Sequence, residues 1–219
     1  QQIIDDPVIP IKWGAEQKGM QTGDEIGCPN YARLVWLESR DKALERADEL
    51  ASMGLHKSLV NRIVEPFAWI TVVMTATEWA NFFRLRCHPD AEIHFQKIAG
   101  MMRDAINEST PEELDAGRWH TPFVLDEERY DVNLITSEIN LLKVSVARCA
   151  RVSYLTHEGK RDIAKDLELF DRLVQGSGFG HWSPHGHVAQ ASDDPNVRSG
   201  PFVGWNQYRK TFTQENLAG

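Results

Sequence analysis

Residues 60–99 read VNRIVEPFAWITVVMTATEWANFFRLRCHPDAEIHFQKIA, and this stretch decides the fold. Its apolar, β-branched run over residues 67–75 favours a strand, although periodicity alone also allows a buried helix. After it, the apolar spacing becomes helical over residues 77–85, with Thr75 or Thr77 as the N-cap. Because polar groups at the end of a buried element often form ligand sites, we expect the functional site in this stretch.

Helical patterns surround this stretch. The sequence predicts amphipathic helices over residues 31–53, 57–64, about 91–107 and 162–174. Gly54 follows the first of these as a C-cap, and Asp90 is expected to cap the third. A further helix start is predicted at residues 109–113, STPEE, where proline and acidic residues occupy the first turn.

The length and charge of the chain limit the classes of function. A chain of 219 residues suits one domain, so we predict a single domain over residues 1–219. A net charge of -8 argues against a protein that coats nucleic acid, and no apolar run is long enough to span a bilayer. Three widely spaced cysteines without a C-x-x-C pair indicate a reducing setting. We therefore expect a cytoplasmic protein with neither a nucleic-acid nor a membrane partner.

Three histidines, His181, His185 and His187, occur in the segment GHWSPHGHV. Imidazole nitrogens at this spacing could bind zinc or iron, but no nearby carboxylate or fourth ligand accompanies them. A surface or ligand-lining loop is the favoured interpretation, and the sequence predicts no metal.

Arg86 ends the largely apolar segment ANFFRLR, where an unpaired charge would be costly. Its partner is either an acidic side chain, Asp90 or Glu78, or an anionic ligand. The chemistry of the residues leaves these two alternatives equal.

Two residue pairs are each open to two interpretations. Cys87 and His88 could form a nucleophile and a base, but neighbours on a helix point in different directions, so Cys87 is predicted to be a core residue. Arg148 and Arg151 could clamp a phosphate, although two arginines on a solvated face are equally common.

Five segments of the chain, in this order, resemble the flavin-dependent thymidylate synthase family (ThyX): VNRIVEP, TATEWANFFRLRCHPDAE, SVARCARVSY, HWSPHGH and GWNQYRK. The resemblance covers nearly the whole chain. It is to the long, phage- and bacterium-associated branch, in which the ARVSY and HWSP segments come last. It implies an α/β (α+β) fold with helices flanking a mixed or antiparallel sheet, and a homotetramer whose sites are shared between subunits. It also implies that FAD, dUMP, methylenetetrahydrofolate and NADPH take part in the reductive methylation of dUMP to dTMP, without a cysteine nucleophile.

The resemblance further implies roles for individual residues. Arg86 matches the arginine that the family places against the uracil edge, where it favours ionisation at N3, and it is the implied catalytic residue. Arg62 matches an arginine that contacts dUMP. The residues that match flavin-binding positions are Thr75, Thr77, Asn81, Asp90, His181 and Ser183.

The chain departs from the family pattern at three places. The arginine-rich R-H-R signature is not found, and in relatives with this segment order it lies just upstream of a stretch like residues 3–14, so we expect it to precede Gln1. The family's S-P-F-E-H is SPHGH over residues 183–187, and its D-A-Q-x-E-I is DAEIHF over residues 90–95. These changes leave two rival functions open. One is a flavin- and folate-dependent pyrimidine nucleotide hydroxymethyltransferase, and the other is a ThyX-like protein that binds nucleotide without catalysis.

Overall fold

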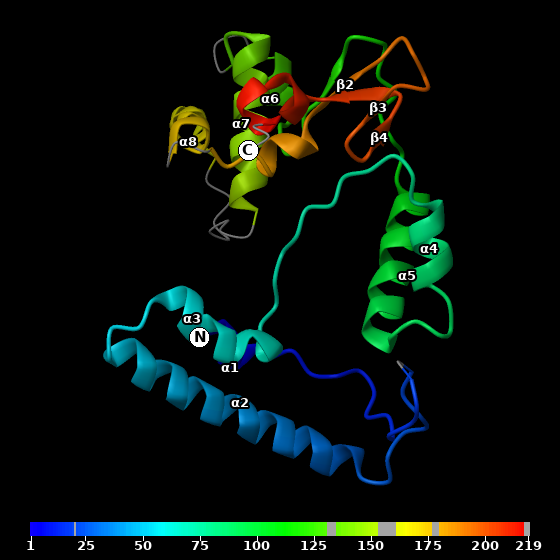
Figure 1. Cartoon of the computed structure of the whole chain (residues 1–219), viewed down its shortest axis with the longest axis vertical. Helices are drawn as coiled ribbons and strands as arrows, with labels where there is room; N and C mark the ends of the chain where they lie inside the picture. The colour runs from blue at the N-terminus through cyan, green and yellow to red at the C-terminus, as the bar shows by residue number, and fades with distance from the viewer. Residues whose placement is uncertain (20, 131–134, 153–160, 177–179, 217–219) are drawn as a thin grey trace. The chain divides into compact units, whose positions relative to one another are not determined.

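The computed structural model describes the chain except residues 20, 131–134, 153–160, 177–179 and 217–219 (Figure 1). The chain divides into two compact units. The N-terminal unit comprises Gln1–Ile70 and Ala80–Ser109, and the C-terminal unit comprises Thr71–Trp79 and Thr110–Gly219. The single domain expected over residues 1–219 stays a prediction.

The main elements of the N-terminal unit are helices. They are α1 (Gln2–Asp5), α2 (Pro29–Ser52), α3 (Lys57–Val64), the 3-10 helix η1 (Glu65–Phe67), α4 (Ala80–Arg86) and α5 (Ile93–Glu108). α2 starts with a proline at its first position and is followed by Gly54 at φ +81°, a conformation that glycine adopts without strain. α3 packs against α2 through the buried residues Ala47, Val60 and Val64. The first two predicted helices are thereby confirmed.

The helices at the centre of residues 60–99 form, but their starts differ from the prediction. α4 begins at Ala80, three positions after the predicted start. α5 is capped by Glu92 and not by Asp90, because the Glu92 carboxylate accepts hydrogen bonds from the backbone N–H groups of His94 and Phe95 at 3.0 and 3.1 Å. The Asp90 carboxylate accepts neither of these N–H groups.

Two local predictions are wrong. Residues 68–76 have no regular structure, and Ile70 and Val72 in this run are 80% and 63% exposed. A strand needs a neighbouring strand to accept its backbone hydrogen bonds, and none of the described strands pairs with this run. Residues 109–113 do not start a helix, because Ser109 closes α5 instead: its hydroxyl donates to the carbonyl of Ile106 at 2.8 Å.

The C-terminal unit is built on two long helices that pack together. Its helices are α6 (Asp126–Tyr130), α7 (Glu138–Arg151), α8 (Ile163–Gln175) and the 3-10 helices η3 (Pro184–His187), η4 (Tyr208–Thr211) and η5 (Thr213–Asn216). α7 lies against α8 (Figure 1), and their contact buries Leu142, Val146 and Phe170. Asp162 caps α8 by accepting the N–H of Lys165 at 3.1 Å. The predicted helix over residues 162–174 is confirmed.

The strands of the C-terminal unit form small antiparallel sheets. β1 (Trp119–His120), β2 (Ala189–Ala191) and β5 (Trp205–Gln207) pair in the order β1-β2-β5, and β3 (Arg198–Ser199) pairs with β4 (Phe202–Val203). Trp119 is opposite Gln190, and Ala189 is opposite Gln207. The chain therefore combines helices with small antiparallel sheets, which agrees with the predicted α+β class.

Candidate functional site

A pocket of about 400 Å³ opens at the turn between α4 and α5 in the N-terminal unit. We call it the α4–α5 pocket; it is lined by Arg84, Leu85, Arg86, His88, Asp90 and Ala91. α4 ends at Arg86 because Pro89 cannot continue a helix, so the end of α4 and the turn after it meet at one surface. The structure thus brings together two residues predicted from the sequence, Arg86 and Asp90.

The guanidinium of Arg86 is exposed, so the expectation of a charge enclosed by apolar residues is wrong. The reason is that α4 has no buried residue. Arg86 Cζ lies 6.0 Å from the ring centroid of Phe95 on α5, within reach of a cation–π contact. Neither acidic alternative is its partner: Asp90 lies near His88, and Glu78, in the C-terminal unit, pairs with Arg198 at 3.3 Å.

His88 holds the turn of the α4–α5 pocket in place. Its Nδ1 accepts the backbone N–H of Asp90 at 3.1 Å, and its carbonyl accepts the side-chain N–H of Gln96 at 2.7 Å. Because Nδ1 accepts a hydrogen bond, this network assigns the ring proton to Nε2. The Asp90 carboxylate is exposed and lies 3.6 Å from Nδ1, beyond hydrogen-bond distance, so its oxygens are available to a ligand.

Glu92 and His94 bind each other at the start of α5. Glu92 Oε1 lies 2.5 Å from His94 Nδ1, and His94 Nε2 accepts the backbone N–H of Ile11 at 3.2 Å. Partial burial acts to raise the pKa of Glu92, but the hydrogen bonds from His94 and from the backbone N–H of Phe95 oppose it and lower the pKa. Two residues that depart from the family pattern thus start α5 and hold the N-terminal arm.

Arg62 and Asn81 have side-chain partners within the N-terminal unit. Arg62 on α3 is exposed and lies 3.4 Å from Glu65, one helical turn later. The side-chain oxygen of Asn81 accepts a hydrogen bond from Arg84 at 3.1 Å. Neither Arg62 nor Asn81 lines the α4–α5 pocket.

Two of the predicted flavin-binding residues, Thr75 and Thr77, hold their own segment in place within the C-terminal unit. Thr75 Oγ1 lies 2.9 Å from His187 Nδ1. Thr77 Oγ1 accepts the backbone N–H of Val203 on β4 at 2.8 Å. Both hydroxyl groups therefore have a partner inside the fold.

His181 and Ser183 lie in the chain that leads from α8 to η3. Their backbones are anchored, because the N–H of His181 donates to the carbonyl of Leu173 at 2.7 Å and the carbonyl of Ser183 accepts the N–H of Gly186 at 3.0 Å. Both side chains are exposed, and neither forms a side-chain hydrogen bond with another residue in the described ranges. Of the predicted flavin-binding residues, Asp90, His181 and Ser183 thus have exposed side chains that make no hydrogen bond with another side chain in the described ranges.

The three histidines of GHWSPHGHV lie in different surroundings. His181 is exposed and His187 contacts Thr75, whereas His185 is fully buried. The His185 ring lies about 5 to 6 Å from four aromatic rings, those of Phe170, Trp182, Tyr208 and Phe212. Burial lowers the pKa of His185 to about 4, so the ring is neutral at neutral pH. In the part of the chain that the structure describes, no three histidine, cysteine or acidic side chains are grouped as metal ligands.

Arg148 and Arg151 belong to a buried ion-pair network. Arg148 binds both carboxylate oxygens of Glu128, at 2.5 and 2.7 Å, and Asp166 at 2.9 Å. Arg151 also pairs with Asp166. The hydrogen bonds from Arg148 lower the pKa of Glu128 to about 2. Arg148 therefore joins α6, α7 and α8, whereas Arg151 joins only α7 and α8. Neither alternative drawn from the sequence describes Arg148, which is buried.

The sequence interpretation missed a group of polar side chains beside β1. Burial is the main cause that lowers the pKa of His120, and the positive charge of Arg129 lowers it further. Burial is also the main cause that lowers the pKa of His187, and the charge of His120 lowers it further. His120 is visible in the segment GRWHTP, residues 117–122, but no local pattern places it near His187, and only the fold brings the two rings together.

Comparison of the chain with protein-family models, with curated proteins and with solved structures finds no match. The resemblance to flavin-dependent thymidylate synthases therefore depends on the five sequence segments. Within the described ranges, no helix is both long and apolar enough to cross a bilayer.

Proposed function

We propose that this chain is a flavin-dependent thymidylate synthase, which converts dUMP to dTMP with FAD, methylenetetrahydrofolate and NADPH. The observation that carries the proposal is the state of Arg86. Its guanidinium is exposed at the α4–α5 pocket, and in the described part of the chain no carboxylate pairs with it. A permanent cation without an acidic partner is suited to an anionic ligand.

The chain's own residues would then act by position and charge. Arg86 would stabilise negative charge that develops on the uracil ring, as a guanidinium does beside any anion. Asp90, in the same pocket as Arg86, would hold a polar group of the flavin, because its carboxylate is exposed. Reduced flavin supplies the hydride in this chemistry, which leaves orientation and electrostatics to the protein.

We also propose that the enzyme is a homotetramer with shared sites. α5 exposes the large apolar side chains of Phe95, Ile98 and Met101, which follow one another at intervals of three residues. Clustered apolar side chains on a helix surface mark an interface, and a second copy of the chain is the proposed partner. Light scattering after size-exclusion chromatography would give the mass of four chains; the mass of a single chain would contradict this part of the proposal.

The visible absorption spectrum tests the flavin proposal on protein expressed from the complete gene. We expect flavin bands that shift when dUMP is added. A protein that stays colourless with added FAD would contradict the proposal and would favour the ThyX-like protein that binds nucleotide without catalysis.

The rival hydroxymethyltransferase is not favoured by a specific observation. The sequence departures that suggested it have roles in the fold: Glu92 and His94 start α5, and His185 is enclosed by aromatic rings. Mass spectrometry of the products distinguishes the two enzymes, since a hydroxymethylated nucleotide in place of dTMP would contradict the proposed synthase.

A further inference from the structure

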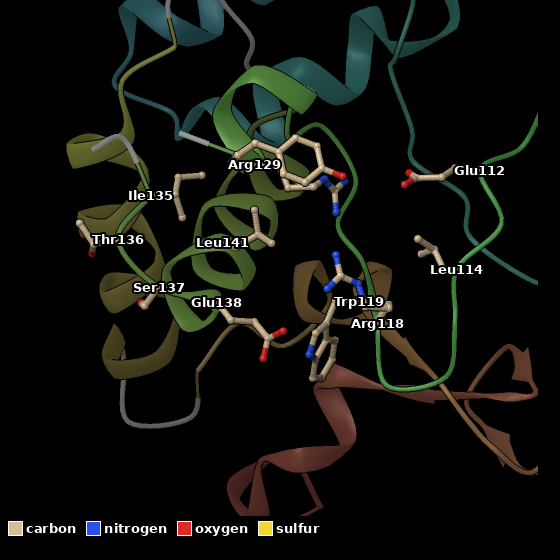
Figure 2. A pocket seen from close by; sticks show the side chains of 11 residues that line it. Glu112, Leu114, Arg118, Trp119, Arg129, Ile135, Thr136, Ser137, Glu138 and Leu141 are labelled. Atoms are coloured by element: carbon tan, nitrogen blue, oxygen red, sulfur yellow. The ribbon is translucent and has the colours of Figure 1, made fainter. Parts of the chain in front are cut away.

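Two arginines face each other across a second pocket, of about 300 Å³, in the C-terminal unit (Figure 2). We call it the arginine pocket. Arg118, just before β1, and Arg129, on α6, point their guanidinium groups toward one another across it. Neither residue is among the positions that the family resemblance assigns to flavin or dUMP. A ligand in this pocket is therefore independent of the proposed synthase activity.

Arg129 lacks a close partner in the described part of the chain. Its side chain is 14% exposed, and its Nε lies 4.0 Å from the carboxylate of Asp126. Its Nε is buried and has no hydrogen-bond partner among the residues described. A buried N–H without an acceptor is costly, so this group is suited to an acceptor that arrives with a ligand.

Arg118 adds a second permanent charge on the opposite side of the pocket. It is exposed, and it makes no ion pair with any other residue that the structure describes. Two guanidinium groups that converge repel each other unless an anion lies between them. The planar N–H forks of arginine match the oxygen atoms of a phosphate or a carboxylate.

Two acidic residues limit the charge of such an anion. Glu112 and Glu138 also line the arginine pocket, on other sides of it (Figure 2), and in the described ranges neither forms an ion pair with the arginines. Their charges offset those of the two arginines over the pocket as a whole. A small anion that fits between the guanidinium groups is therefore preferred to a polyanion.

The arginine pocket also has an apolar wall. Trp119 lines it, and its ring makes an edge-to-face contact with the ring of Tyr208, with centroids 5.6 Å apart and an interplanar angle of 85°. Leu141 and Ile135 continue the wall. An aromatic ring packs well on such a surface, and about 300 Å³ holds a molecule with one ring.

We propose that the arginine pocket binds a small aromatic oxyanion, with its phosphate or carboxylate between Arg118 and Arg129 and its ring against Trp119. Isothermal titration calorimetry without flavin or dUMP tests this with phenyl phosphate, benzoate, inorganic phosphate and benzyl alcohol. Phenyl phosphate or benzoate should bind, and the tighter of the two identifies the anionic group. Benzyl alcohol, which lacks the charge, should not bind.

Variants of the two arginines locate the site. Arg129→Gln and Arg118→Gln should each weaken binding at least about tenfold. The matched control is Arg172→Gln, which removes an exposed arginine from α8 and should leave affinity unchanged. Glu138→Gln should strengthen binding, because it removes a negative charge from the lining.

Three results would overturn the proposal. They are no binding of either aromatic oxyanion, equal affinity for inorganic phosphate and phenyl phosphate, and arginine variants that bind as tightly as the unaltered protein. Circular dichroism checks the folding of each variant. If Arg129→Gln does not fold, Arg118→Gln decides, since Arg118 is exposed and its removal leaves no cavity.

Discussion

Arg148 on α7 donates two parallel hydrogen bonds to the carboxylate of Glu128 on α6, at 2.5 and 2.7 Å. Both side chains are less than a tenth exposed, and the same guanidinium also binds Asp166 on α8. The carbonyl of Phe123 accepts a further hydrogen bond from Arg148 at 2.9 Å, and Phe123 itself has a φ of +63°, which a bulky residue rarely adopts. This network links three helices by ion pairs, so the loss of one of its members should measurably lower the free energy of unfolding.

The ion pair of Glu128 should make stability depend on pH. Its folded pKa of about 2 is below the ordinary value of 4.5, so its contribution is fully present above about pH 4.5 and is lost as the pH falls toward 2. Glu128→Gln should lower the free energy of unfolding by about 3 kcal/mol at neutral pH, and the difference should nearly vanish near pH 2. Urea unfolding at several pH values measures this. A difference that stays constant with pH would contradict it.

Removal of Arg148 should cost more than removal of an exposed arginine. Arg148→Met leaves Glu128 and Asp166 buried without their main cation, so we expect a loss of roughly 3–5 kcal/mol in the free energy of unfolding. Arg172→Met on α8 is the control and should change it by less than about 0.5 kcal/mol. Equal effects of the two substitutions would show that the network does not stabilise the unit.

The buried His185 should weaken the fold in mild acid. Its folded pKa of about 4 is below the ordinary 6.5, so between these values the unfolded chain takes up a proton that the folded ring does not. The free energy of unfolding should therefore fall as the pH drops from about 6.5 to about 4. His185→Phe fits the aromatic surroundings and should remove this slope, whereas His181→Phe, at an exposed position, should keep it. Thermal unfolding at several pH values compares them.

Glu92, and not Asp90, should be the residue that stabilises the start of α5. Glu92→Ala removes the acceptor of two backbone N–H groups and should cost about 1 kcal/mol in the free energy of unfolding. Asp90→Ala is the matched control and should cost less than about 0.5 kcal/mol. A double-mutant cycle with His94→Ala should show coupling between Glu92 and His94. If the losses in the free energy of unfolding from the two single substitutions simply add, the contact between Glu92 and His94 does not stabilise the fold.

Arg86 should matter for turnover and not for folding. Arg86→Ala is expected to lower the rate of dTMP formation at least about a hundredfold, because it removes a charge beside the uracil. The circular dichroism spectrum and the unfolding midpoint should not change, since the side chain is exposed. Arg103→Ala, an exposed arginine on α5 that pairs with Asp104, should retain activity. An unstable Arg86→Ala protein would show instead that Arg86 is a structural residue.

The helices α2, α3 and α8 could be predicted because their signals are local. α8 has its cap at Asp162 and its apolar face within one short segment, and α2 ends where Gly54 follows it. The start of α5 was predicted less well, because N-cap propensity favours Asp90, and only the geometry of the turn brings the Glu92 carboxylate to the first N–H groups. The run over residues 67–75 shows the limit of propensity, since β-branched residues form a strand only when another strand is beside them.

The sequence by itself predicted the helices α2, α3, α5 and α8, and its five segments led to Arg86 and Asp90 and implied the α+β class. Only the tertiary structure decided which charges meet. Arg148 binds Glu128 and Asp166, 20 and 18 residues away, and Thr75 contacts His187, 112 residues away. The guanidinium groups of Arg118 and Arg129 converge because β1 and α6 bring them to one pocket. Capping and helical periodicity act within a few residues of the chain, whereas ion pairs and pockets depend on distances in space that packing alone sets.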